Sequence, residues 1–129
     1  MAGNLSDYAE IAVLDWLLGG ATPTRPPARY VALFTAAPTD AGGGTEVSGG
    51  GYARQAMTCG AAASGATSNS ADVSFTASGA AFGTVSHIGI FDASTAGNLL
   101  WWGALTTSKA VGDGDTLTFA AGDIDFSLD

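Results

Sequence analysis

The sequence predicts a mainly β protein: an antiparallel β-sandwich or barrel of about seven strands, with one N-terminal α-helix. Short segments with alternating apolar residues recur from residue 29 onward, and turn residues separate them. Only the stretch before residue 20 places apolar residues at the three- and four-residue spacing of a helix. The chain has 129 residues, a length that favours a single domain over residues 1–129.

The helix is expected over about residues 5–18, with Asn4 or Ser6 as its N-cap. Gly19–Gly20 should end it, because glycine adopts the left-handed capping conformation without strain. One apolar face has helical spacing: Tyr8, Ile11, Leu14 and Leu18. Three further residues widen this face beyond what one packed side needs: Val13, Trp16 and Leu17. These three are candidate interface residues, and the helix could pack on its own sandwich or on a neighbour.

A proline-rich connector at residues 21–28 joins the helix to a β-sandwich over residues 29–129. Its strands are expected, in order, in RYVALFTA (29–36), GYARQAMTC (51–59), ADVSFTA (71–77), TVSHIGIFD (84–92), NLLWWGAL (98–105), DTLTFAAG (115–122) and DIDFSLD (123–129). The low-complexity segment AAASGATSNSA (61–71) is expected to be a surface loop.

Alternation along these segments predicts which side chains form the core. They are Val31, Leu33, Val73, Phe75, Ile88, Ile90, Leu117, Phe119, Ile124 and Phe126. In the segment 84–92, strict alternation sends Val85, His87 and Phe91 to the face opposite Ile88 and Ile90. Trp101 and Trp102 are adjacent in the sequence, so one should enter the core and the other should face an interface or a ligand. Both are kept as candidate interface residues.

Charge and composition exclude several classes of protein. The formal net charge is -8, from 12 acidic and 4 basic residues, which argues against a nucleic-acid partner. No apolar run approaches the roughly 20 residues of a membrane span, and MAGNLSDYAE lacks the pattern of a signal peptide. We therefore expect no membrane partner. Residues are 47% hydrophobic and only 12% charged, which indicates a surface that other subunits partly cover.

The glycine-rich stretch TDAGGGTEVSGGGYARQ (39–55) is predicted to be a structural loop. A phosphate-binding loop opens a helix and ends in Lys followed by Ser or Thr, whereas these glycines lead into Tyr-Ala-Arg-Gln. Tyr52 and Arg54 are candidate anchors of the loop, with Arg54 on a carboxylate.

No catalytic, cofactor-binding or metal-binding set is predicted, so we expect no enzyme activity and no cofactor. Cys59 and His87 are the only cysteine and the only histidine, and each fits a packed side chain better than a nucleophile or a base. Four aspartates could bind calcium. The alternative is that they lie in a hairpin turn and on the solvent-facing side of a strand. They are Asp113, Asp115, Asp123 and Asp125.

Three blocks of the sequence carry a resemblance to a known family. These are NLSDYAEIAVLDWLL (4–18), LFTAAPTDAGGGTEVSGGGYARQ (33–55) and HIGIFDASTAGNLLWWGAL (87–105). They resemble small glycine- and alanine-rich structural proteins of tailed bacteriophages, a family often labelled tail fibre or minor virion protein. The resemblance covers nearly the whole chain and includes no catalytic motif. It implies a virion component, assembled in the host bacterial cytoplasm.

Two placements in the virion follow from this resemblance. The chain is expected first as a capsid decoration, or cement, protein that docks on the major capsid protein lattice, since it is short for a fibre shaft plus a receptor-binding head. The alternative is a tail, neck or tail-fibre component involved in host attachment. In either case the expected partners are further copies of the chain, as a homotrimer, and other virion proteins.

Overall fold

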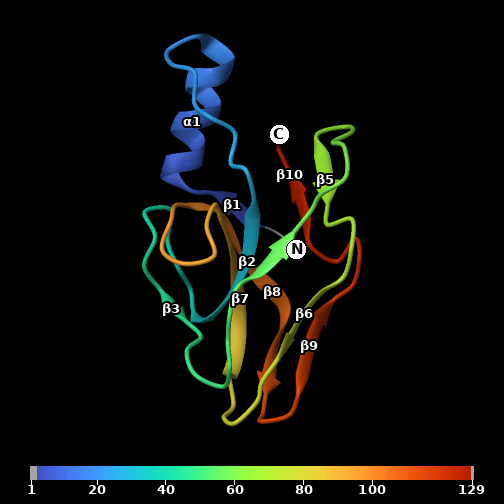
Figure 1. Ribbon diagram of the computed structural model, residues 1–129. Helices are drawn as coiled ribbons and strands as arrows, with labels where there is room; N and C mark the ends of the chain where they lie inside the picture. The colour runs from blue at the N-terminus through green and yellow to red at the C-terminus, as the bar shows by residue number, and fades with distance from the viewer. Residues whose placement is uncertain (1–2, 129) are drawn as a thin grey trace.

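The computed structural model describes residues 3–128 and is mainly β, as the sequence predicts. Within these residues it has one helix, α1 (Asp7–Leu18), and ten strands. The strands are β1 (Gly3–Leu5), β2 (Arg29–Ala36), β3 (Thr45–Glu46), β4 (Gln55–Met57), β5 (Ala66–Ser68), β6 (Val73–Thr76), β7 (Gly83–Phe91), β8 (Leu99–Val111), β9 (Thr116–Phe119) and β10 (Asp125–Ser127) (Figure 1).

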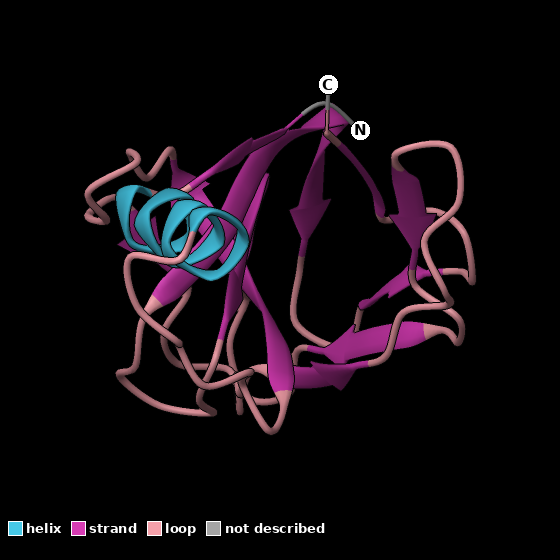
Figure 2. Ribbon diagram, turned by 90° about the horizontal axis from the view of Figure 1, so that it is seen from above, coloured by secondary structure: helices cyan, strands magenta, loops and turns pink. Residues whose placement is uncertain are grey.

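All strand pairs are antiparallel and form one main sheet and two ribbons. The main sheet has the order β1-β8-β7-β2-β3, and β4 pairs with the first half of β2 on the edge that β3 shares. The ribbons are β5 with β10 and β6 with β9. Seen from above, the strands encircle the interior and α1 stands at its edge (Figure 2).

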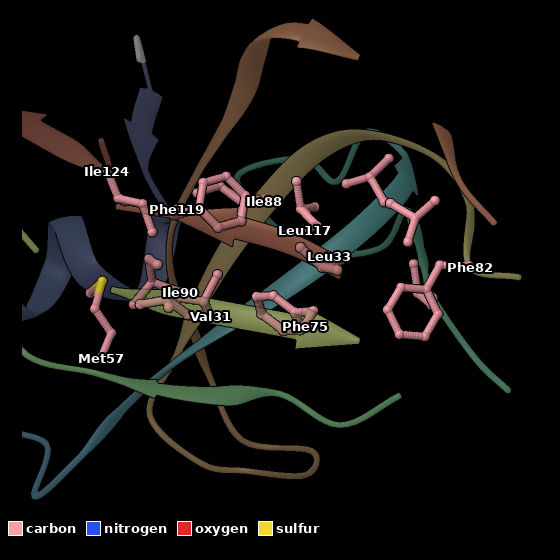
Figure 3. Packing of buried hydrophobic residues seen from close by; sticks show 14 of the residues in the cluster. Val31, Leu33, Met57, Phe75, Phe82, Ile88, Ile90, Leu117, Phe119 and Ile124 are labelled. Atoms are coloured by element: carbon pink, nitrogen blue, oxygen red, sulfur yellow. The ribbon is translucent and has the colours of Figure 1, made fainter. Parts of the chain in front are cut away.

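The core lies between the main sheet and the ribbons, where side chains from β2, β6, β7 and β9 meet (Figure 3). Nine of the ten residues expected in the core are buried, and the tenth, Phe126, is half-buried at its edge. In β2, the run from Val31 to Phe34 is buried throughout, because the strand carries apolar side chains on both faces and both are covered. Burial of this kind is the main term that stabilises the fold.

Two short strands were not expected. β1 and β5 have three residues each, which is too short for alternation to stand out. β3 agrees with the short strand-like interruption expected within the glycine-rich loop at residues 45–47. β5 lies within the segment 61–71, expected to be a loop, where it pairs with β10. β8 is longer than expected and runs on to Val111, whereas β4 is limited to Gln55–Met57.

The expected orientation of Val85 is wrong, because β7 and β8 change register beside it. Val85 pairs with Lys109 and His87 pairs with Ala104. The single residue between Val85 and His87 in β7 therefore lies opposite the four residues between Ala104 and Lys109 in β8. This bulge interrupts the alternation. Val85 is fully buried with Ile88, while His87 stays half-exposed.

Helix α1 begins and ends at the expected residues, but the face expected to pack is exposed. The Ser6 side chain accepts a hydrogen bond from the Ala9 amide and donates one to the Leu99 carbonyl, while Gly19 ends the helix at φ 85°. Ala9 is the buried residue of α1. A small side chain there lets the helix approach β8 closely, so the apolar face built on Ile11 points away from the sheet.

Candidate assembly surface

Helix α1 carries most of the large apolar side chains that the structure leaves exposed. They are Tyr8, Ile11, Leu14, Trp16, Leu17 and Leu18, joined by Leu128 near the C-terminus. Trp16 is 67% exposed and Leu17 is 63% exposed, so both of these candidate interface residues are accessible. Val13, the third candidate on the helix, is half-buried. Figure 1 shows α1 at one end of the molecule, beyond the strands of the main sheet.

A groove of about 600 Å³ runs along the inner side of α1. Ala9, Ala12 and Val13 form its helix wall, and the connector forms a second wall that includes Pro23 and Arg25. The other side is made by Met57 of β4 and by β5, β10 and neighbouring residues, among them Cys59, Phe126 and Leu128. The end of the molecule that carries α1 therefore combines an exposed apolar helix with an apolar groove.

The structure separates the two tryptophans, Trp101 and Trp102, as their adjacency in β8 requires. Trp101 is buried, only 9% exposed, and its ring packs edge-on against Phe126 at 5.2 Å between centroids. It is therefore a core residue that forms part of the lining of the groove. Trp102 is half-exposed on the opposite face, where its Nε1 donates a 2.8 Å hydrogen bond to Asp40 and its ring lies beside His87.

Tyr52 and Arg54 converge on Glu46, the carboxylate that the sequence left unidentified. Arg54 donates two hydrogen bonds of 2.9 Å to the two carboxylate oxygens of Glu46, and the Tyr52 hydroxyl donates a third at 2.7 Å. The same hydroxyl accepts a hydrogen bond from the Leu33 amide in β2. Arg54 also lies 3.7 Å over the ring of Phe91. The middle and the C-terminal end of the glycine-rich loop are thereby tied to each other and to β2.

These contacts shift the ionisation of all three side chains. Partial burial alone would raise the pKa of Glu46, but the hydrogen bonds from Arg54 and Tyr52 and the charge of Arg54 outweigh burial and lower the pKa. Burial, and then the hydrogen bond to Glu46, raise the pKa of Tyr52. The hydrogen bond to Glu46 raises the pKa of Arg54. Glu46 and Arg54 are therefore a charged pair at neutral pH.

The remaining candidates for chemistry lie apart from one another. Cys59 is half-buried beside the groove, and burial raises the pKa of its thiol above the ordinary value, which disfavours the reactive thiolate. His87 shares a 2.8 Å hydrogen bond with Ser86. Within residues 3–128, the structure shows no group of three or more His, Cys, Asp and Glu side chains placed to hold a metal ion.

Three of the aspartates considered for calcium accept hydrogen bonds from backbone amides, one across the fold and two within their own turns. Asp113 accepts a hydrogen bond from the Gly79 amide, Asp115 from the Gly112 amide and Asp123 from the Ala120 amide. Asp125 lies on β10 and is exposed. The described part of the chain also contains no helix long and apolar enough to cross a membrane.

The sequence is similar to a known protein family over almost its whole length. No curated protein matches the chain. The model of the family described as podophage GP4 fiber I protein gp80 matches residues 4–127, which includes α1, the connector and every strand from β2 to β10. That match spans nearly the whole chain. The chain therefore belongs to this family of bacteriophage virion fibre proteins.

Proposed function

We propose that this chain is a structural component of a virion fibre and that it attaches to other virion proteins and to further copies of itself through the α1 end. The observation that carries the proposal is the family match over residues 4–127, because the family description names a fibre protein. We expected a capsid decoration role first from the sequence, but the family description does not mention capsid decoration. The fibre alternative fits the match better.

The exposed helix supports attachment through apolar contacts. Soluble monomers rarely expose contiguous apolar patches of more than a few hundred Å², and larger patches mark interaction sites. Trp16 and Leu17 remain the candidate interface residues on α1, and tryptophan is enriched at the buried centres of interfaces. Trp102 is a weaker candidate because its indole already donates to Asp40.

The proposal assigns no catalytic step and no nucleic-acid partner. Cys59 and His87 lie on different segments, and burial disfavours the Cys59 thiolate. The chain carries 12 acidic and 4 basic residues, which would repel a phosphate backbone. A homotrimer remains the expected assembly, and its closed symmetry would bury the same surface on each copy.

Counting copies in purified particles tests this proposal. Quantitative mass spectrometry would compare peptides of this chain with peptides of the major capsid protein in the same digest. A fibre component should be present in far fewer copies than the capsid protein. A copy number close to that of the capsid protein would contradict the fibre role and would restore the decoration role.

A further inference from the structure

The outer face of α1, formed by Ile11, Leu14 and Leu18, has the composition of a buried surface. These three side chains are 57% to 80% exposed, and no part of the described chain covers them. If each of these three side chains offers on the order of 100 Å², the outer face offers about 300 Å² of apolar surface. An exposed apolar patch of a few hundred Å² on a soluble protein is often an interaction site.

Carboxylates border this outer face. A helix advances about 100° per residue, so Glu10 and Asp15 lie on either side of the line through Ile11, Leu14 and Leu18. Asp7 adds a third negative charge in the first turn, and the helix has no basic residue. A partner that covers the outer face must therefore supply an apolar centre with positive charge at its edge.

The groove beside α1 has those properties on the same chain. Its walls are apolar, and its volume of about 600 Å³ has room for several large side chains. Arg25 and Arg29, two of the 4 basic residues of the chain, are among its lining residues. Arg25 is exposed, and among residues 3–128 the structure shows no ion pair for it, whereas Arg54 is paired with Glu46.

We propose that the partner of α1 is a second copy of this chain, in which the outer face of α1 from one copy lies in the groove of the other. Apolar burial supplies the attraction, and Arg25 of the groove opposite Glu10 and Asp15 of the entering helix sets the orientation. The contact closes either as a reciprocal pair or as a ring, and a ring of three is the homotrimer expected from the sequence. The inference deepens the proposed function and rests on the self-association included in it.

Charge reversal tested across two copies decides whether the groove and the helix meet. Size-exclusion chromatography with light scattering would give the mass of the purified full-length chain over a range of concentrations. Two variants reverse the proposed contact: Arg25→Glu in the groove, and the double variant Glu10→Lys with Asp15→Lys in the helix. Lys109→Glu is the matched control, because Lys109 is an exposed basic residue on β8 that does not line the groove.

The parent chain should associate, and each variant alone should associate at least about tenfold more weakly, because like charges then face each other. An equal mixture of the two variants should associate more strongly than either variant alone, because each helix of one variant finds a groove of opposite charge on the other. A reciprocal pair should recover fully, whereas a ring of three keeps one contact between two copies of the same variant and should recover in part. The control should behave as the parent. Circular dichroism spectra that match the parent would show that each variant is folded.

Three results would overturn the inference. They are a parent that stays a monomer at the highest concentration, variants that associate as well as the parent, and a mixture that associates no better than either variant alone. A monomer that binds a different virion protein through α1 would also overturn it, because the occupant of the groove would then not be a second copy. None of these results bears on the copy count in the particle, so the fibre role would be judged separately.

Discussion

At the scale of single residues, the contacts among Glu46, Tyr52 and Arg54 connect a loop to the core. Glu46 lies on β3, and Arg54 and Tyr52 lie at the far end of the glycine-rich loop. A bidentate arginine–carboxylate pair is a strong and directional form of charged hydrogen bond. The Arg54 side chain also donates to the carbonyls of Ala93 and Ala96, so a third segment is held by the same guanidinium.

Glu46→Gln should destabilise the protein in a pH-dependent way. The pKa of Glu46 is lowered in the folded state, so its contribution is present above the ordinary value of 4.5 and is lost as the pH falls through the lowered value. At pH 7 the variant should lose about 1.5–3 kcal/mol of unfolding free energy, the range for hydrogen bonds to charged groups. The difference between the parent and the variant should shrink as the pH falls below 4.5 and through the lowered pKa.

Urea denaturation at several pH values measures this difference. The matched control is Glu10→Gln, because Glu10 is the other glutamate of the chain and is exposed on α1. The control should shift stability only slightly. A difference between parent and Glu46→Gln that stays constant from pH 7 to pH 3 would show that the charge of Glu46 does not stabilise the fold.

At the scale of elements, the glycines of the loop are not equivalent. Gly43 and Gly44 both have positive φ, at 80° and 76°. A Cβ on Gly43 would meet nothing within 4 Å, whereas a Cβ on Gly44 would lie 2.7 to 2.9 Å from backbone atoms of residues 36–38. The loop therefore needs glycine at position 43 for its backbone conformation, and at position 44 for both its backbone conformation and the lack of space for a side chain.

Gly44→Ala should therefore cost more stability than Gly43→Ala. The conformational penalty alone is about 1 kcal/mol for a non-glycine residue at such an angle, and the backbone clash at Gly44 adds to it. Thermal melts of the two variants against the parent make the comparison. Equal melting temperatures for the two variants would mean that the loop moves away from residues 36–38 without cost.

The sequence was sufficient to predict the elements that combine length with a strong pattern. β2 runs over Arg29–Ala36 as expected, and α1 has Ser6 as its cap. β5 could not be predicted, because its three residues come from a low-complexity segment and its partner β10 is distant in the chain. The buried position of Val85 depends on a register change between two strands, and no local pattern carries that information.

The candidate site was predicted in part. Alternation required that one of Trp101 and Trp102 be buried, but only the packing of Phe126 shows that it is Trp101. Likewise, helical spacing identified an apolar face on α1 without saying what covers it. The close approach of Ala9 to the sheet turns that face outward, and a pattern of large apolar residues cannot reveal a contact made through a small one.

At the scale of the whole molecule, a stable β core carries an apolar helix at one end. Attachment through that helix should resist salt, because screening weakens exposed ion pairs far more than apolar burial. Purified particles washed in about 1 M salt, where the Debye length is roughly 3 Å, should retain the protein. Gel analysis of pellet and supernatant measures retention. Complete release would mean that charge, rather than apolar burial, holds the chain on the particle.

The central claim is that this chain is part of a virion fibre, and its location on the intact particle tests that claim most directly. Gold-labelled antibody against the purified chain, viewed on particles by electron microscopy, reports this location. Label should lie on fibres that project from the particle and should be absent from the rest of the shell. Uniform label over the capsid surface, or particles with intact fibres and no label, would contradict the claim.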